Sequence, residues 1–139
     1  MQIQTMMFFS SPQLVYLTVF LLACLAFPSD ALLRVYGMNG KGLDGDVLNP
    51  PEPYVKVFVR NILMGQTYVI NSSSNPTWST NVVSSTAKVN DEVKLQVWDK
   101  DIKYDDLLGT CYATVRSGIN SFRCSLSKGG TLSYMTEFH

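Results

Sequence analysis

Short runs of alternating apolar and polar residues, separated by clusters of Gly, Pro, Asn, Asp and Ser, fill the chain from Leu32 onward. The alternation is clearest at residues 55–59 and 93–97, where valines and Leu95 take every second position. This period places these side chains on one face of a strand, toward the core, and no stretch keeps helical periodicity for three turns. We therefore predict an all-β, eight-stranded antiparallel two-sheet sandwich. The expected strands are Leu32–Tyr36, Tyr54–Arg60, Gln66–Ile70, Trp78–Val83, Val93–Trp98, Thr110–Val115, Ser121–Leu126 and Thr131–Thr136.

The first thirty residues differ from the rest, because residues 14–27 form an apolar run without a charged side chain. The run is shorter than the about 20 residues that a membrane-spanning helix needs. We interpret residues 1–31 as a secretory signal peptide, cleaved after Ala26 or Ala31, and residues 32–139 as the mature domain. No Lys or Arg precedes Leu14, so an uncleaved signal anchor is the alternative.

Two features of the mature domain suit the oxidising secretory pathway. Cys111 and Cys124 are its only cysteines, and an even pair in that compartment indicates a disulfide, with two buried free thiols as the alternative. Asn71-Ser72-Ser73 is a glycosylation sequon, whereas Asn75 precedes Pro76 and is not an acceptor. We expect one disulfide and one candidate N-glycan, at Asn71.

Carboxylates are concentrated in two loops, with Asp44, Asp46 and Glu52 in one and four aspartates between residues 99 and 106 in the other. Crowded carboxylates repel one another unless a cation neutralises them. Oxygen donors without a His or Cys cluster suit calcium better than zinc. The simpler alternative is a solvated turn, since Asp favours turns.

The order of short motifs along the mature chain resembles the C2 domain family. The motifs are Gly45-Asp46, Glu52-Pro53-Tyr54-Val55-Lys56-Val57, Asn75-Pro76-Thr77-Trp78, Val97-Trp98-Asp99-Lys100-Asp101 and Asp106-Leu107-Leu108-Gly109. Within that family the chain is most similar to the carboxy-terminal C2 domain of perforins, on three further features. These are Gly42-Leu43, the run Asp105 to Cys111, and Phe122-Arg123-Cys124-Ser125-Leu126 ahead of Gly129-Gly130-Thr131-Leu132.

This resemblance implies a C2-type sandwich with calcium-binding loops at one end. The calcium ligands that it implies are Asp46, Glu52, Asp99, Asp101 and Asp106, with Asp105 as the alternative to Asp106. The family normally has Asp where this chain has Glu52, and the third loop is one residue short. The implied membrane contacts are the apolar side chains beside these ligands, namely Leu43, Val47, Leu48, Ile102 and Tyr104.

The resemblance further implies a secreted protein that binds phospholipid membranes when calcium is bound, and it suggests a role in immune defence. A full-length perforin is a further candidate partner. The alternative is an extracellular recognition protein that binds a glycan, a pathogen surface or a protein partner without docking on lipid. A glycan at Asn71, near the presumed docking end, would favour that alternative.

Two other function classes are disfavoured by the residues themselves. The formal net charge of zero gives no electrostatic argument for nucleic-acid binding. The only histidine is His139, the last residue, where a positioned general base is not expected. We therefore expect no catalytic residues and no enzymatic activity.

Overall fold

The computed structural model describes residues 31–45 and 48–139, and the described residues belong to the compact unit Ala31–His139. The expected signal peptide falls outside the described residues, apart from Ala31. The predicted ligand Asp46 and the predicted membrane contact Val47 also lie outside them.

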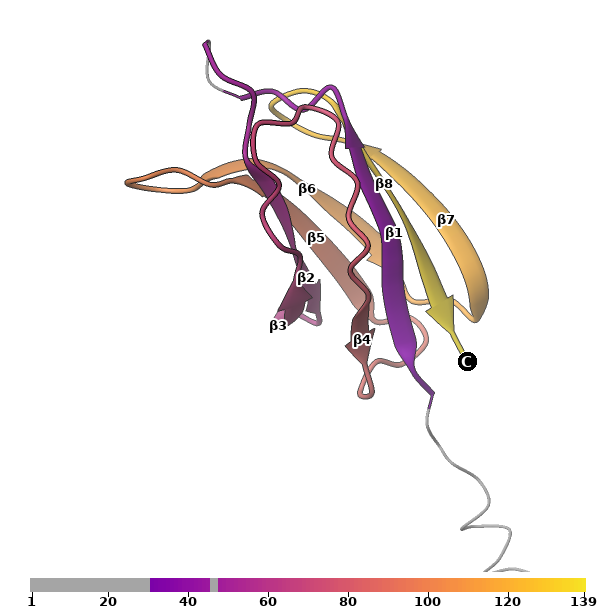
Figure 1. The fold of residues 1–139 in the computed structure, drawn as a ribbon. Coiled ribbons are helices and arrows are strands. Elements are labelled where there is room, and N and C mark those ends of the chain that lie inside the picture. Colours follow the sequence, from indigo (N-terminus) through magenta and orange to yellow (C-terminus); the bar gives the residue numbers. More distant parts are fainter. Residues whose placement is uncertain (1–30, 46–47) are drawn as a thin grey trace, which may run out of the picture. The chain divides into compact units, whose positions relative to one another are not determined.

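Eight strands form two four-stranded antiparallel sheets, as predicted (Figure 1). One sheet has the order β4-β1-β8-β7 and the other β3-β2-β5-β6. The strands are β1 (Leu33–Lys41), β2 (Pro53–Val59), β3 (Ile62–Gln66), β4 (Val82–Ser84), β5 (Glu92–Asp99), β6 (Asp106–Thr114), β7 (Gly118–Ser125) and β8 (Thr131–Phe138). No helix in the described part of the chain has the length and apolar character needed to span a membrane.

The hydrophobic core lies between the two sheets and confirms the expected alternation. Val55 and Val57 on β2 pair with Val97 and Leu95 on β5, and all four side chains are buried. Trp78, from the connection between β3 and β4, is 1% exposed and belongs to the same core. Every second residue of the central strands therefore packs inward, as a half-buried strand requires.

β1 is longer than predicted because it continues across Gly37. This glycine has φ +61°, a left-handed conformation that other residues rarely adopt, and the register with β8 shifts at this point. The resulting bulge allows the strand to reach Lys41, beyond the predicted end at Tyr36. The connection toward β2 therefore begins at Gly42 and not at Gly37.

The hairpin between β2 and β3 is tighter than predicted. Arg60 and Asn61 have φ values of 50° and 63°, which is the left-handed pair that a two-residue hairpin turn of type I′ requires. β3 therefore starts at Ile62, and the predicted strand Gln66–Ile70 is wrong except at Gln66.

β4 is reduced to three residues, Val82–Ser84, of which only the first two lie in the predicted strand Trp78–Val83. Ahead of β4, Trp78 donates its amide to the Met38 carbonyl at 2.9 Å and buries its indole. The Gly40 amide donates to the Pro76 carbonyl at 2.9 Å, and Asn39 and Thr77 form an isolated bridge. The segment before β4 thus follows β1 without forming a continuous ladder.

Cys111 on β6 and Cys124 on β7 form the predicted disulfide, with a Cα–Cα distance of 5.9 Å. These strands are edge strands of different sheets. The covalent link therefore fastens the two sheets to each other along one side of the sandwich.

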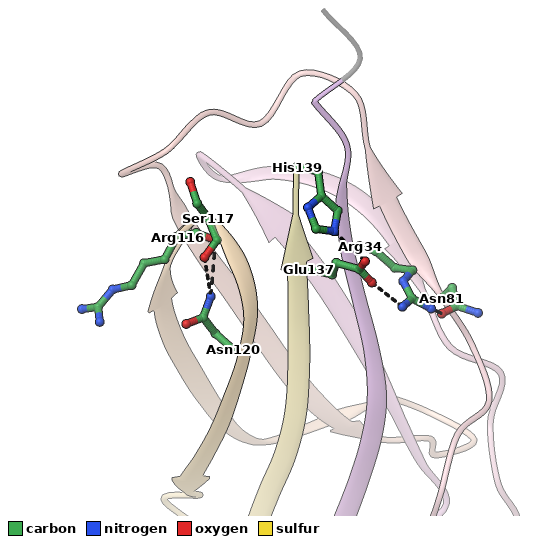
Figure 2. Close-up of polar contacts among 7 residues, drawn as sticks. All are labelled: Arg34, Asn81, Arg116, Ser117, Asn120, Glu137 and His139. Carbon is green, nitrogen blue, oxygen red and sulfur yellow. Dashed lines mark hydrogen bonds and ion pairs between the residues drawn. The ribbon is translucent and has the colours of Figure 1, made fainter. Parts of the chain in front are cut away.

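A polar cluster occupies the end of the sandwich where β1 begins and β8 ends (Figure 2). Arg34 on β1 donates to Glu137 on β8 at 2.5 Å and to the Asn81 side chain at 3.3 Å. His139 lies beside Glu137, with Nε2 2.7 Å from Oε1. The single histidine of the sequence is thus at the end opposite to the loops that carry the predicted calcium ligands.

Candidate functional site in the carboxylate-rich loops

Three connections meet at one end of the sandwich, namely β1–β2, β3–β4 and β5–β6 (Figure 1). Backbone hydrogen bonds tie them together. The Leu43 amide donates to the Ser74 carbonyl, and the Ser73 amide donates to the Pro51 carbonyl, both at 2.9 Å. The Lys100 amide donates to the Glu52 carbonyl at 2.9 Å. Residues far apart in the sequence are therefore held side by side by their main chains.

Asp99, the last residue of β5, lies at the centre of this end. Its Cα partners are Pro53 on β2 and Asp106 on β6. The residue is 8% exposed, and its carboxylate accepts a hydrogen bond from the Glu52 amide at 2.8 Å. Pairing on both sides fixes the position of Asp99 and brings the Glu52 and Asp106 backbones next to it.

Glu52 and Asp106 keep their carboxylates available. Both residues are half-buried, and among the described residues neither carboxylate takes part in a hydrogen bond or an ion pair. Because β2, β5 and β6 are adjacent, the backbones of these two residues lie on either side of Asp99. Available acceptors beside a fixed carboxylate are suited to a cation with oxygen preference.

Asp105, in contrast, is engaged by the protein. Tyr54 on β2 donates its hydroxyl to Oδ2 of Asp105, and the Asp101 amide donates to Oδ1 at 3.1 Å. Lys100 Nζ lies 3.7 Å from the same Oδ1. The hydrogen bond from Tyr54, together with the one from the Asp101 backbone, lowers the pKa of Asp105. Burial, followed by the same hydrogen bond, raises the pKa of Tyr54 to about 12.

These contacts distinguish the two adjacent aspartates that the sequence left as alternatives. Asp105 has both carboxylate oxygens occupied by donors of the loop itself. Asp106 begins β6 and has no such contact within the described residues. Asp105 therefore braces the β5–β6 loop, and Asp106 is the one left with ligand capacity.

Asp101 lies at the exposed outer part of the β5–β6 loop. Its Oδ1 accepts a hydrogen bond from the Ile102 amide at 2.6 Å, which tightens the turn. A surface hollow extends from this loop to the β1–β2 and β3–β4 connections. The residues that line it are Asn49, Pro50, Glu52, Ser72, Asp99, Lys100, Asp101 and Ile102.

The chemistry of the donors fits calcium, because every predicted ligand is a carboxylate and the described residues of the three connections include no histidine or cysteine. Within residues 31–45 and 48–139, however, no three His, Cys, Asp or Glu side chains are grouped so that they could hold a metal ion. Glu52, Asp99, Asp101 and Asp106 are brought to one end by the strands, but they do not form a closed cage there.

Three of the predicted membrane contacts project from this end. Leu48 is 90% exposed, Ile102 is 100% exposed and Tyr104 is 82% exposed. Ile102 and Tyr104 lie in the β5–β6 loop and Leu48 in the β1–β2 connection. Exposed apolar side chains that gather at one end of a domain are typical of a membrane or partner interaction site.

The prediction that Leu43 is a membrane contact is wrong. Its side chain is 2% exposed and belongs to the hydrophobic core. It packs on the Gly40 backbone so closely that a Cβ at Gly40 would lie 2.9 Å from Leu43 Cδ1. Because β1 extends to Lys41, Leu43 follows directly after the strand and turns inward under the loops.

Asn71, the predicted glycosylation site, is exposed and lies in the β3–β4 connection. The Ile70 amide before it donates to the Pro53 carbonyl at 3.0 Å. Ser72 after it has φ +49° and lines the same hollow as Asp99. The sequon therefore borders the carboxylate-rich end.

Two residues that support the site were not singled out from the sequence. Tyr54 was placed in a strand and a family motif without a role at the site, yet its hydroxyl reaches Asp105, 51 positions later. Thr67 is buried, and its Oγ1 accepts from the Val55 amide at 2.9 Å while its own amide donates to the Val55 carbonyl. Neither contact leaves a sequence signal, because both depend on which residues the fold brings together.

Comparisons with known proteins agree with this architecture. The protein-family model described as C2 domain matches residues 31–129. The chain is 36% identical to perforin-1 of Rattus norvegicus and 35% identical to perforin-1 of Homo sapiens, each over 105 residues. Each match covers 71% of this chain and 18% of the relative, so the chain spans less than a fifth of perforin-1.

Solved structures give the same result. A structure described as that of a C2 domain has a TM-score of 0.76 at 36% identity, covering 78% of this chain and 97% of its own. A calcium-bound structure of two C2 domains of extended synaptotagmin 2 gives a TM-score of 0.68 at 20% identity, with 78% of this chain and 45% of that chain covered. The second likeness is one of fold.

Proposed function

Because this chain belongs to the C2 domain family, we propose that it is a secreted, calcium-dependent module that docks on phospholipid membranes. The docking end is the one where the β1–β2, β3–β4 and β5–β6 connections meet. In this role the domain binds a surface and catalyses no reaction.

One observation carries the proposal. Ile102 and Tyr104, which are largely solvated, lie in the same short loop as Asp101, three and five positions after Asp99. Carboxylates beside exposed apolar tips combine the two elements that interfacial binding needs, namely a cation site near the headgroups and side chains that enter the interface.

The residues that would hold calcium are Glu52, Asp99, Asp101 and Asp106, with Asp46 from the β1–β2 connection. When bound, the ion supplies positive charge and open coordination positions for the phosphate oxygens of lipids. Asp99 is already fixed by the Glu52 amide, and Asp105 holds the loop through Tyr54. Lys100 and Lys103 add positive charge at the same end and would favour anionic headgroups.

The similarity to perforin-1 motivates the biological context. We place the module in immune defence, with a full-length perforin as a candidate partner. The disulfide between Cys111 and Cys124 suits the oxidising environment of a secreted protein. The wider activity of perforin-1 is not transferred, since the alignment covers 18% of that protein.

Co-sedimentation with vesicles tests the proposal. The wild type and an Asp99→Asn, Asp101→Asn variant are mixed with phosphatidylserine-containing or pure phosphatidylcholine vesicles over a calcium series that spans roughly 10⁻⁴ to 10⁻³ M, the usual range of extracellular modules. Asn at position 99 keeps an Oδ1 acceptor for the Glu52 amide. A Glu92→Gln variant is the matched control, because Glu92 is exposed at the opposite end of β5.

The proposal requires binding by the wild type and by Glu92→Gln, and loss of binding in the double variant. Absence of binding by the wild type at every calcium concentration contradicts it. The leading function would then be recognition of a glycan, a pathogen surface or a protein partner by the same loops.

A further inference from the structure

We propose that an N-linked glycan on Asn71 regulates the docking end by standing at its rim and obstructing the approach to a membrane. This inference rests on the function proposed above and names a form of regulation for the same site. It predicts two forms of the protein that share one fold and differ in membrane binding.

The backbone places Asn71 beside Glu52. On one side of Asn71, the Ile70 amide donates to the Pro53 carbonyl at 3.0 Å. On the other side, the Ser73 amide donates to the Pro51 carbonyl at 2.9 Å. Residues 70–73 are thus anchored to the two neighbours of Glu52, and this main-chain position does not depend on any side-chain rotamer.

Ser72, the residue after Asn71, lines the surface hollow at the carboxylate-rich end together with Asp101 and Ile102. The left-handed φ of Ser72, +49°, turns the chain sharply at this point. A group attached one residue earlier therefore starts at the edge of the surface that carries the carboxylates and the apolar tip.

The Asn71 side chain can carry a glycan without any loss of packing. It is exposed, and it makes no hydrogen bond within the described residues. Asn71-Ser72-Ser73 is the only acceptor sequence in the chain, since Asn75 is followed by Pro76. Attachment at this position changes the surface and leaves the core intact.

A glycan is bulky and strongly hydrophilic. Interfacial side chains such as Ile102 must sink by about 5–10 Å into the boundary between headgroups and acyl chains. A glycan that begins beside Glu52 would have to share that layer with the lipid headgroups or hold the tip away from it. Either result weakens membrane docking without changing any of the carboxylates proposed to bind calcium.

The experiment compares three preparations of the chain, expressed in full in mammalian cells that lack N-acetylglucosaminyltransferase I, so that any N-glycan stays in the high-mannose form that endoglycosidase H cleaves. They are the wild type, the wild type trimmed by endoglycosidase H to a single N-acetylglucosamine, and Asn71→Gln. Peptide N-glycosidase F and mass spectrometry establish occupancy. Calcium-dependent partition onto phosphatidylserine-containing vesicles is then measured for each preparation.

We expect the untrimmed wild type to partition roughly tenfold more weakly than the trimmed protein and Asn71→Gln, with similar calcium midpoints. Absence of a mass shift overturns the inference, and so does equal partition of all three preparations, although equal partition leaves the proposed function intact. If Asn71→Gln and the trimmed protein fail to bind at all, the proposed function itself is contradicted and the inference falls with it.

Discussion

Tyr54 on β2 donates its hydroxyl to the Asp105 carboxylate, so a buried strand residue holds the loop between β5 and β6. The same carboxylate receives the Asp101 amide, which closes the loop on itself. The consequence is a division of roles between neighbours: Asp105 supports the loop, while the Asp106 carboxylate makes no hydrogen bond within the described residues.

Replacement Tyr54→Phe should loosen this loop while leaving the core filled. Hydrogen bonds to charged groups contribute about 1.5–3 kcal/mol. Since the Asp105 side chain is 22% exposed, we expect a loss of about 1 kcal/mol in the free energy of unfolding, measured with urea. The pKa of Asp105 should rise toward its ordinary value in a carboxyl NMR titration, because its largest stabilising contact is removed.

Tyr112→Phe is the control for this variant, because Tyr112 is 64% exposed and belongs to the same sheet. It should change neither the unfolding midpoint nor the Asp105 titration. An unchanged Asp105 pKa in Tyr54→Phe would contradict the bracing role.

The stability should depend on alkaline pH through Tyr54 and Tyr134. Burial raises the pKa of each to about 12, from an ordinary value of 10. A raised pKa disfavours the tyrosinate in the folded state, so this contribution is complete below pH 10 and is lost as the pH rises through about 12. The free energy of unfolding should therefore fall as the pH rises over this range, and it should fall less steeply in Tyr54→Phe than in the wild type. Identical slopes in the two proteins would show that Tyr54 titrates as an exposed phenol.

The apolar tip of the β5–β6 loop should matter for membranes and not for folding. Ile102→Ser is expected to weaken vesicle partition by about 1 kcal/mol, roughly fivefold, because an interfacial Ile recovers part of its full burial energy. Its melting temperature should be unchanged, since Ile102 is 100% exposed. Ile119→Ser, at 60% exposure on β7, is the matched control and should bind as the wild type does. Equal losses in both variants would point to general surface hydrophobicity.

The disulfide should be important for stability and secondary for binding. Cys111 and Cys124 are 13 positions apart, and chain-entropy arguments assign about 3 kcal/mol to a loop of this size. A Cys111→Ser, Cys124→Ser variant should therefore unfold at a lower urea concentration by a corresponding amount. Below its unfolding transition it should still bind vesicles in calcium, because neither cysteine lies in the three loops. Loss of binding in a folded variant would contradict this separation.

The sequence predicted those parts of the fold that rest on local patterns. Alternation at Val55, Val57 and Val97 was sufficient to place the central strands and their buried faces. The turn at Arg60 and Asn61 was missed, because a left-handed pair without glycine gives a weak turn signal. One missed turn was enough to displace β3.

The sequence indicated which loops carry the acidic residues, but it did not indicate which way every neighbouring side chain points. The acidic residues were singled out from their clustering in two loops and from the resemblance to the C2 family. The roles of Asp105 and Asp106 depend on Tyr54, whose distance along the sequence hides the contact. Leu43 was misassigned because an apolar residue in a Gly-rich loop can point either way. Its inward direction follows from the longer β1, which depends on a bulge at Gly37.

Amide NMR spectroscopy during a calcium titration locates the bound ion without requiring a membrane. We expect the amides of Glu52 and of residues 99–106 to shift at calcium concentrations of roughly 10⁻⁴ to 10⁻³ M. The amides of Arg34 and Glu137 at the opposite end should remain in place. An unchanged spectrum at millimolar calcium, or shifts spread evenly over both ends, would contradict the assignment of a calcium-dependent docking surface.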